Sequence, residues 1–340
     1  MPTHAAELVF DEATKQYPGR PEAAVDRLSL TVPAGEICVL VGPSGGGKTT
    51  ALKLVNRLIA LSDGDIRIDG SSILEHDLTE LRRSIGYVIQ QVGLFPHMTV
   101  EANVATVPRL LGWSRQRIRE RVAELLDLVG LDHAADGRRY PAQLSGGQRQ
   151  RVGLARALAA NPPLMLMDEP FGALDPIVRG RLQDEFLRLQ GELRKTVVFV
   201  THDIDEAIRI GDRIAILRQG GRLAQYDTPE RILREPADDF VAQFVGADRA
   251  LKALALRTLG ELELAPPDDG GSAAALPAET TLRDALAFLV AEHADRVGVV
   301  DGDGRALGVA TREQLLGDPG STASPAGGGG GSAGAGAGST

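Results

Sequence analysis

The sequence has little cysteine, few aromatic residues and no long hydrophobic run. Its one cysteine, Cys38, cannot form an intrachain disulfide, and its place inside the apolar run ICVLV indicates a buried side chain in a reducing compartment. No apolar run approaches the roughly 18 residues of a membrane span, and no lysine or arginine precedes Lys15, so neither a span nor a signal peptide is expected. These absences predict a cytosolic protein, or one that docks on a membrane subunit.

The chain also lacks an excess of positive charge. Its 340 residues include 37 lysines and arginines against 46 aspartates and glutamates, a formal net charge of −9. This balance disfavours broad attraction to nucleic acid or anionic lipid, although a local basic patch stays compatible with it. We therefore expect no nucleic-acid partner. A length of 340 residues allows one large domain and a small one.

Four short apolar runs are typical of buried parallel strands, at residues 37–41, 164–167, 197–200 and 214–217. Helical patterns separate them. Residues 115–129 carry apolar side chains at steps of three and four, and the arginines at the start of that segment are interpreted as a solvated face rather than a nucleic-acid site. The alternation of strand and helix predicts an α/β domain over residues 1–245.

The composition changes after residue 245. Residues 246–275 read as a helical connector, with a helical stretch over 248–264, followed by a linker rich in proline, glycine and serine. Residues 276–318 read as a small α+β unit: a helix from Thr281, two strands joined at DGDG, and a helix that Thr311 and Gln314 open with capping-box spacing. The Gly/Ala/Ser tail, 319–340, is expected to be disordered.

The stretch GPSGGGKTT follows the first strand and precedes a helical pattern, as G-x-x-x-x-G-K-[ST] requires. Its glycines allow backbone N–H groups to surround phosphates, the lysine adds a point charge, and the hydroxyl after it is a Mg²⁺ ligand. The predicted phosphate-binding residues are Gly42, Pro43, Ser44, Gly45, Gly46, Gly47, Lys48, Thr49 and Thr50.

Two acidic residues end the strand LMLMDEP. Asp168 is a hard oxygen ligand suited to Mg²⁺, and Glu169, one residue further, is placed to accept a proton from an attacking water. The alternative is that both acids only occupy a strand-to-helix turn.

Two more polar residues follow strand-like runs. His202 ends VVFVTH, where the ligands of parallel sheets collect, and its imidazole is a candidate partner for a terminal phosphate. Gln90 follows IGYVI and offers an amide oxygen to metal or water. A structural histidine and a surface glutamine are the alternatives.

The stretch LSGGQRQRVGLARAL places Ser145, Gly146 and Gly147 at a helix start, where unpaired N–H groups attract anions. The chain thus contains two candidate phosphate cradles for one nucleotide.

The phosphate loop, LSGGQ, LMLMDEP and VTHD, in this order, resemble the nucleotide-binding domain of ABC transporters over about residues 8–245. The resemblance implies a P-loop NTPase of ABC type with a helical subdomain, acting on ATP with Mg²⁺. It implies that Tyr17 stacks on adenine, Gln90 is the Q-loop glutamine and a metal ligand, Asp175 is the D-loop aspartate, and His202 is the switch histidine with a catalytic role.

The same resemblance gives the second cradle a role. In this family two subunits pack head to tail, so each ATP lies between one phosphate loop and the partner's signature motif. A homodimer is therefore implied. The signature residues that would contact the partner's ATP are Leu144, Ser145, Gly146, Gly147 and Gln148.

Finer features, such as IGYVIQQVGLFPHMTV and FVTHDIDEAIRIGDRIAIL, resemble the ATP-binding subunit of quaternary-amine importers. Such a subunit works at the cytoplasmic face of the membrane with a permease, and indirectly with an extracytoplasmic solute-binding protein, to import glycine betaine, choline, carnitine or proline betaine. Residues 91–107 resemble the surface that receives the permease, with a plain loop as the alternative. An importer of another small solute, or an ABC-type ATPase outside transport, remains an alternative function.

The terminal unit resembles a CBS domain through RVGVVDGDGRALGVATREQLL. Only one such unit is present, and Gln314 stands where an acidic ribose ligand is usual. These departures favour a structural or dimer-stabilising role over nucleotide sensing.

Overall fold

The computed structural model describes residues 5–89, 93–172, 174–266 and 274–317. The chain divides into two compact units, Met1–Arg249 and Ala250–Thr340. Each unit has its own hydrophobic core. Within the described ranges, no helix is both long and apolar enough to cross a membrane.

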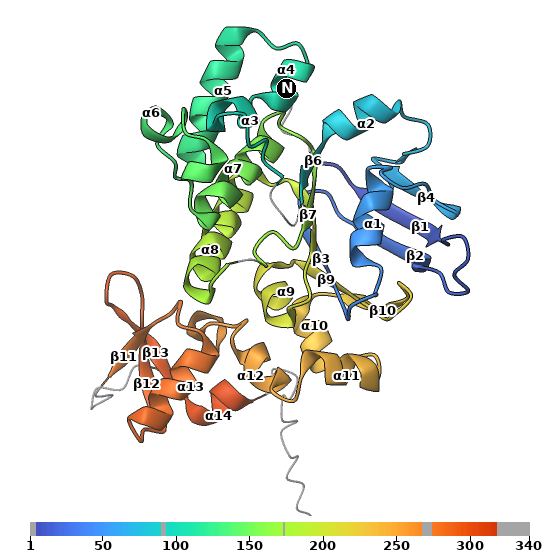
Figure 1. The fold of residues 1–340 in the computed structure, drawn as a ribbon. Coiled ribbons are helices and arrows are strands. Elements are labelled where there is room, and N and C mark those ends of the chain that lie inside the picture. Colours follow the sequence, from blue (N-terminus) through green and yellow to red (C-terminus); the bar gives the residue numbers. More distant parts are fainter. Residues whose placement is uncertain (1–4, 90–92, 173, 267–273, 318–340) are drawn as a thin grey trace, which may run out of the picture. The chain divides into compact units, whose positions relative to one another are not determined.

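A six-stranded sheet forms the centre of the first unit, with the strand order β10-β9-β3-β8-β7-β6 (Figure 1). All neighbours are parallel except β10, which pairs antiparallel with β9. The three central strands are buried on both faces, which explains their uninterrupted apolar sequences. The strands are β3 (Ile37–Val41), β6 (Ile85–Val88), β7 (Leu164–Asp168), β8 (Thr196–Val200), β9 (Arg213–Leu217) and β10 (Leu223–Asp227).

This strand order positions the site. Strand β8 lies between β3 and β7, although it follows both in the sequence. Because the three strands are parallel, their carboxyl ends meet at one edge. The four strands predicted from apolar runs are confirmed, to within one residue at either end.

A second, antiparallel sheet of the first unit has the order β2-β1-β4-β5, and sequence analysis did not predict it. Its strands are β1 (Leu8–Lys15), β2 (Val25–Val32), β4 (Asp63–Ile68) and β5 (Ser71–Ser72). Phe10 and Ile66 of this sheet, Leu52 of helix α1 and Leu40 of β3 belong to one buried cluster. The helix that follows the phosphate loop is therefore packed in a core that both sheets share.

The helices between β6 and β7 form a separate group, which lies to one side of these strands in Figure 1, while β1, β2 and β4 lie to the other. Helix α7 of this group packs against β6. The group consists of α3 (Val100–Val104), α4 (Thr106–Leu110), α5 (Arg115–Leu128), α6 (His133–Asp136) and α7 (Gly146–Leu158). The other helices are α1 (Lys48–Val55), α2 (Leu78–Ser84), α8 (Pro176–Leu193), α9 (Ile204–Ile210), α10 (Pro229–Arg234) and α11 (Asp239–Val245).

Helix α5 confirms the helix predicted at residues 115–129, and Val122, Leu125 and Leu126 form its buried stripe. The arginines at the start of this helix were predicted to form a solvated face, and one of them, Arg121, does not. Arg121 is only 16% exposed and donates to the carbonyls of Leu158 and Ala159 at the end of α7. That side chain therefore holds two helices together.

The second unit contains a three-stranded sheet, β11-β12-β13, and the helices that the sequence predicts on either side of the hairpin. Thr311 and Gln314 form the predicted reciprocal capping box. The continuous helix expected over residues 248–264 was wrong: a helix covers Arg249–Leu254 only, and Leu259 and Leu262 pack into the core of this unit. The elements are α12 (Arg249–Leu254), β11 (Ala275–Pro277), α13 (Leu282–Ala291), β12 (Arg296–Val300), β13 (Ala306–Thr311) and α14 (Arg312–Leu316). The tail predicted to be disordered lies outside the described residues.

Candidate functional site

The phosphate loop connects β3 to α1, and its conformation requires glycine at two positions. Gly47 caps α1 with φ of +77°, and a Cβ there would lie 2.2 Å from the carbonyl oxygen of Ala24. A Cβ at Gly42 would lie 2.3 Å from the carbonyl oxygen of Leu217. Any other residue at either position would clash with backbone, so the loop shape is determined by contacts from distant strands.

Residues 44–50 of this loop line an open cavity of about 520 Å³ together with Glu169 and His202. Lys48 lies at its base, only 8% exposed, with Nζ donating to the carbonyls of Gly42 and Pro43 at 2.7 and 3.0 Å. Burial lowers the pKa of Lys48, and the nearby carboxylates of Glu169 and Asp168 oppose that effect. A buried cation beside first-turn N–H groups favours an anionic ligand.

Two of the three predicted Mg²⁺ ligands, Thr49 and Asp168, lie in contact. Thr49 Oγ1 donates to Asp168 Oδ1 at 2.9 Å. Burial raises the pKa of Asp168, the hydrogen bond from Thr49 lowers it, and the charge of Glu169 raises it. Both are hard oxygen donors, which suit Mg²⁺.

Glu169 and His202 also lie together, as the adjacency of β7 and β8 requires. His202 Nδ1 is 3.3 Å from Glu169 Oε1, and the histidine side chain is 65% exposed against 21% for the glutamate. Both side chains line the cavity of the phosphate loop, with the carboxylate of Glu169 more shielded from solvent than the imidazole of His202.

Tyr17 lines a second cavity of about 370 Å³, which shares Gly45, Gly47 and Thr50 with the first. Lys15 Nζ lies 5.1 Å from the centre of the Tyr17 ring. Arg20 and Gln219 also line this cavity. Neither was predicted from the sequence, because neither belongs to a motif or to a regular strand or helix. The shared wall puts the cavity lined by Tyr17 directly beside the phosphate loop.

The structure does not bring every predicted residue to this site. Gln90 lies outside the described residues. The described residues that line the two phosphate-loop cavities include none of the signature motif, 144–148. Leu144 is buried, and Ser145 is exposed at the N-terminus of α7, where it forms a capping box with Gln148. Gly146 and Gly147 form the first turn of that helix.

Asp175 has a local structural role. It caps α8, and its carboxylate accepts hydrogen bonds from the backbone N–H groups of Ile177 and Val178 at 3.2 and 3.0 Å. It is exposed and does not line either phosphate-loop cavity. The cap explains an aspartate here whether or not it meets a partner.

The Asp168→Asn variant should raise the Tm of the nucleotide-free chain at about pH 8. Because the folded-state pKa of Asp168 is raised above 3.8, the stability of the chain falls as the pH rises from that value through the folded pKa. An amide removes the buried charge and can still accept from Thr49. Thermal unfolding at several pH values tests this.

The gain from Asp168→Asn should shrink towards about pH 4, where the native carboxyl becomes protonated. The Asp184→Asn variant, at a carboxylate 66% exposed and paired with Arg209, should show no comparable gain. A lower Tm of Asp168→Asn at about pH 8 would contradict the assigned effect of burial.

Comparison with known proteins identifies the family. The ABC transporter family model matches residues 25–172. The osmoprotectant import ATP-binding protein OsmV of Salmonella typhimurium is 49% identical over 319 residues, which cover 93% of this chain and 82% of that protein. The choline transport ATP-binding protein OpuBA of Bacillus subtilis is 48% identical over 294 residues, 86% of this chain and 75% of that protein.

A solved structure gives the same result for the fold. The dimeric post-hydrolysis structure of the ATP-binding cassette MJ0796, bound to ADP and Pi, matches with a TM-score of 0.58 and 36% identity. The match covers 65% of this chain and 98% of that one. The ABC-type α/β cassette predicted from the sequence is confirmed. The chain therefore belongs to the ATP-binding subunits of ABC transporters, and among them to the ATPases of osmoprotectant and quaternary-amine importers.

Proposed function

We propose that this chain hydrolyses Mg²⁺-ATP as a head-to-tail homodimer on the cytoplasmic side of a permease, and so drives uptake of a quaternary amine osmolyte such as glycine betaine, choline, carnitine or proline betaine. The observation that carries the proposal is the convergence of the phosphate loop, Asp168, Glu169 and His202 at one edge of the central sheet.

In this proposal the residues divide the work by position. Lys48 and the N–H groups of residues 44–50 hold the phosphates, and Tyr17 supports the base. Glu169 orients the attacking water and accepts its proton, while His202 contacts the terminal phosphate from the exposed side. The electrostatic stabilisation of the phosphoryl group comes mainly from fixed donors around it.

Thr49 and Asp168 would hold Mg²⁺, with Gln90 as the third predicted ligand. A metal there would neutralise charge on the terminal phosphates. In the described ranges no group of three or more His, Cys, Asp or Glu side chains forms a metal site. One hydroxyl and one carboxylate fit Mg²⁺, which is commonly bound by one or two protein ligands together with substrate phosphates and water.

The position of the signature helix supports a homodimer. Ser145 and the N–H groups at the start of α7 are absent from the cavities around the chain's own phosphate loop. A helix start with exposed donors is suited to an anion. We infer that it meets ATP bound by a second copy, in which Leu144 to Gln148 and Asp175 reach across. The solved relative MJ0796 is described as dimeric.

We propose that residues 91–107, of which Gln91 and Val92 lie outside the described residues, form the surface that receives the permease. Phe95 is 39% exposed. Its loop is fixed by the buried Asn103, which accepts from the Phe95 N–H and donates to the carbonyls of Phe95, Met98 and Thr99. An exposed apolar side chain on a rigid loop is pre-organised for a protein contact.

The terminal unit is proposed to be a CBS-like unit with a structural role. Gln314 uses its side chain to cap α14 and to bond the carbonyl of Glu263, so it is committed to the fold of this unit. These bonds favour a structural or dimer-stabilising role over binding of a nucleotide ribose.

Uptake of labelled glycine betaine into vesicles that contain the permease and this chain tests the proposal. We expect ATP-dependent uptake with the native chain and none above background with Glu169→Gln, at equal amounts of assembled transporter. Glu192→Gln, at an exposed carboxylate of α8 paired with Arg188, is the control and should behave as the native chain. Uptake of a different small solute, with no response to quaternary amines, would support the alternative importer and contradict this proposal.

A further inference from the structure

Glu169 has a backbone conformation that is costly for a glutamate. Its φ is +45°, in the left-handed region that a non-glycine residue adopts only when surrounding contacts hold it there. Two of those contacts are backbone hydrogen bonds: the Glu169 N–H donates to Val200 O at 3.0 Å, and its carbonyl accepts from the Gly172 N–H at 3.2 Å. Both act on Glu169 itself, from β8 and from the turn that follows.

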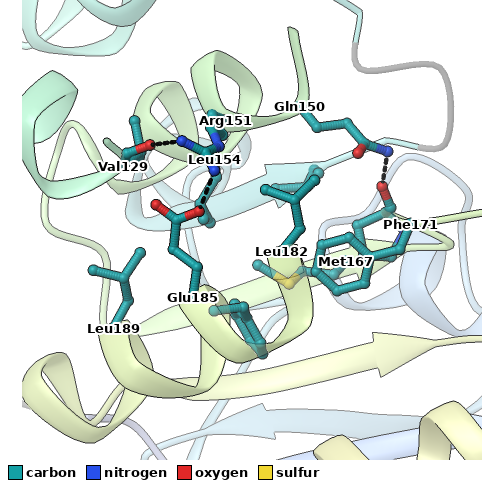
Figure 2. Close-up of a pocket in the computed structure, with 12 residues that line it drawn as sticks. Val129, Gln150, Arg151, Leu154, Met167, Phe171, Leu182, Glu185 and Leu189 are labelled. Atoms are coloured by element: carbon teal, nitrogen blue, oxygen red, sulfur yellow. Dashed lines mark hydrogen bonds and ion pairs between the residues drawn. The ribbon is translucent and has the colours of Figure 1, made fainter. Parts of the chain in front are cut away.

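A third contact comes from another part of the chain. Gln150, on the second turn of α7, is 9% exposed, and its Nε2 donates to the carbonyl oxygen of Pro170, the residue after Glu169 (Figure 2). Since Pro170 lacks an N–H and is itself buried, this carbonyl is its backbone hydrogen-bonding group. The bond links the signature helix to the peptide unit between Pro170 and Phe171, one residue beyond Glu169.

The contacts around the Gln150 side chain give no reason why an amide at this position would stabilise the folded chain. Its Oε1 is buried without a hydrogen-bond partner among the described residues. Figure 2 shows the side chain above an apolar wall that includes Met167, Phe171 and Leu182, which line the same cavity. An unpaired buried acceptor costs free energy, and an apolar side chain of the same shape would avoid that cost. The donated hydrogen bond to Pro170 is what the amide adds.

Helix α7 is also attached to α8 beside this contact. Arg151 Nη2 lies 2.8 Å from Glu185 Oε2, and Arg151 Nη1 donates to Val129 O at 3.2 Å (Figure 2). The start of α7 is therefore held at a defined distance from α8, and the position of Gln150 depends on both helices.

We propose that Gln150 is a positioning residue for Glu169: its amide fixes the Pro170 carbonyl and so maintains the left-handed backbone that aims the Glu169 carboxylate at the phosphate loop. This inference rests on the proposed function, in which Glu169 accepts the proton of the attacking water. The same bond makes the aim of Glu169 sensitive to the start of α7, where Ser145 is proposed to meet the partner's ATP.

The Gln150→Met variant of the full chain tests the proposal, because methionine keeps the length and shape of the side chain and lacks the donor. We expect kcat for ATP hydrolysis to fall about ten- to a hundred-fold, since a displaced catalytic group loses rate without losing ground-state binding. The KM for ATP should stay within about twofold, because no phosphate contact is removed. The Tm should change by less than about 3 °C, since the lost bond and the lost unpaired acceptor offset each other.

A matched control is Gln190→Met. Gln190 also donates from Nε2 to backbone carbonyls, those of Gly35 at 3.2 Å and of Lys195, and it lines neither phosphate-loop cavity. It should leave kcat unchanged. Gln150→His, which retains a ring N–H donor, should recover part of the lost kcat. Gln150→Leu replaces Gln150→Met in the comparison if the methionine variant does not fold.

A native kcat in Gln150→Met, or an equal loss of kcat in Gln190→Met, would overturn the positioning role. Glu169→Gln in the same assay distinguishes failure of the Gln150 positioning role from failure of the proposed catalytic role of Glu169. If Glu169→Gln hydrolyses ATP at the native rate, the proposed function of Glu169 fails; if Glu169→Gln is inactive while Gln150→Met is fully active, only the present inference fails.

Discussion

The Glu169→Gln variant is expected to lose ATP hydrolysis by about 10²- to 10⁴-fold while it still binds ATP. The amide keeps the size of the side chain but does not accept a proton from water. The substitution leaves the phosphate loop itself unchanged, because Glu169 lies outside the loop, after β7, and lines the cavity together with residues 44–50. Phosphate release under steady-state conditions measures the loss.

The same variant should accumulate as a dimer in Mg²⁺-ATP, because a γ-phosphate that both subunits contact is no longer removed. Size-exclusion chromatography with and without ATP detects this. Glu192→Gln serves as the control: it should hydrolyse ATP as the native chain does and should show no such accumulation of dimer. Native hydrolysis by Glu169→Gln would contradict the assigned base, and failure to trap a dimer would contradict the sandwich.

Equal mixing of Lys48→Ala and Ser145→Arg subunits should restore ATPase activity that neither variant shows alone. Lys48→Ala removes the buried charge at the base of the cavity, and we expect about a hundred-fold lower activity from it. Ser145→Arg blocks the start of α7, which lies outside the cavities of its own phosphate loop. In a head-to-tail heterodimer, one ATP site then contains both substitutions. The other site contains an intact phosphate loop and an intact signature motif.

The matched control for this mixture is Lys48→Ala with Glu169→Gln. Lys48 and Glu169 line the same cavity of one chain. Each chain of that heterodimer therefore has one substitution at its own phosphate-loop cavity, and no intact site forms. Activity in the first mixture and not in the second supports contact across the dimer. An inactive first mixture, with heterodimers demonstrated by tagged subunits, would mean that Ser145 acts on its own chain or not at all.

The sequence predicted those features that depend only on residues close together in the chain. The apolar runs of β3, β7 and β8 are buried on both faces and were predicted as such. The capping boxes at Ser145 and Thr311 also depend only on residues three apart. Strand β2 shows a missed signal: residues 28–32, LSLTV, alternate between buried and exposed positions, which is the pattern of a one-sided strand.

Other features had no local signal. The helix predicted over 248–264 ends at Leu254, and Leu259 and Leu262 beyond it pack into the core of the second unit, a contact that periodicity along the chain does not reveal. Asp175 was assigned by resemblance, and its hydrogen bonds to the start of α8 add a local reason for the residue. Gln150 was not singled out from the sequence, because its contact with Pro170 joins residues 20 positions apart.

By itself the sequence determined the chemistry available to this protein: a loop that surrounds phosphates, two carboxylates at a strand end, a histidine after another strand and a helix start that attracts anions. The tertiary structure decided which of these act together. The pairing of β8 with β7 brings His202 to Glu169, the packing of α1 against β7 brings Thr49 to Asp168, and Ser145 is not among the residues that line that cavity. The physical reason is that strand order arises from packing between segments far apart in the chain, whereas motifs and caps arise from neighbours.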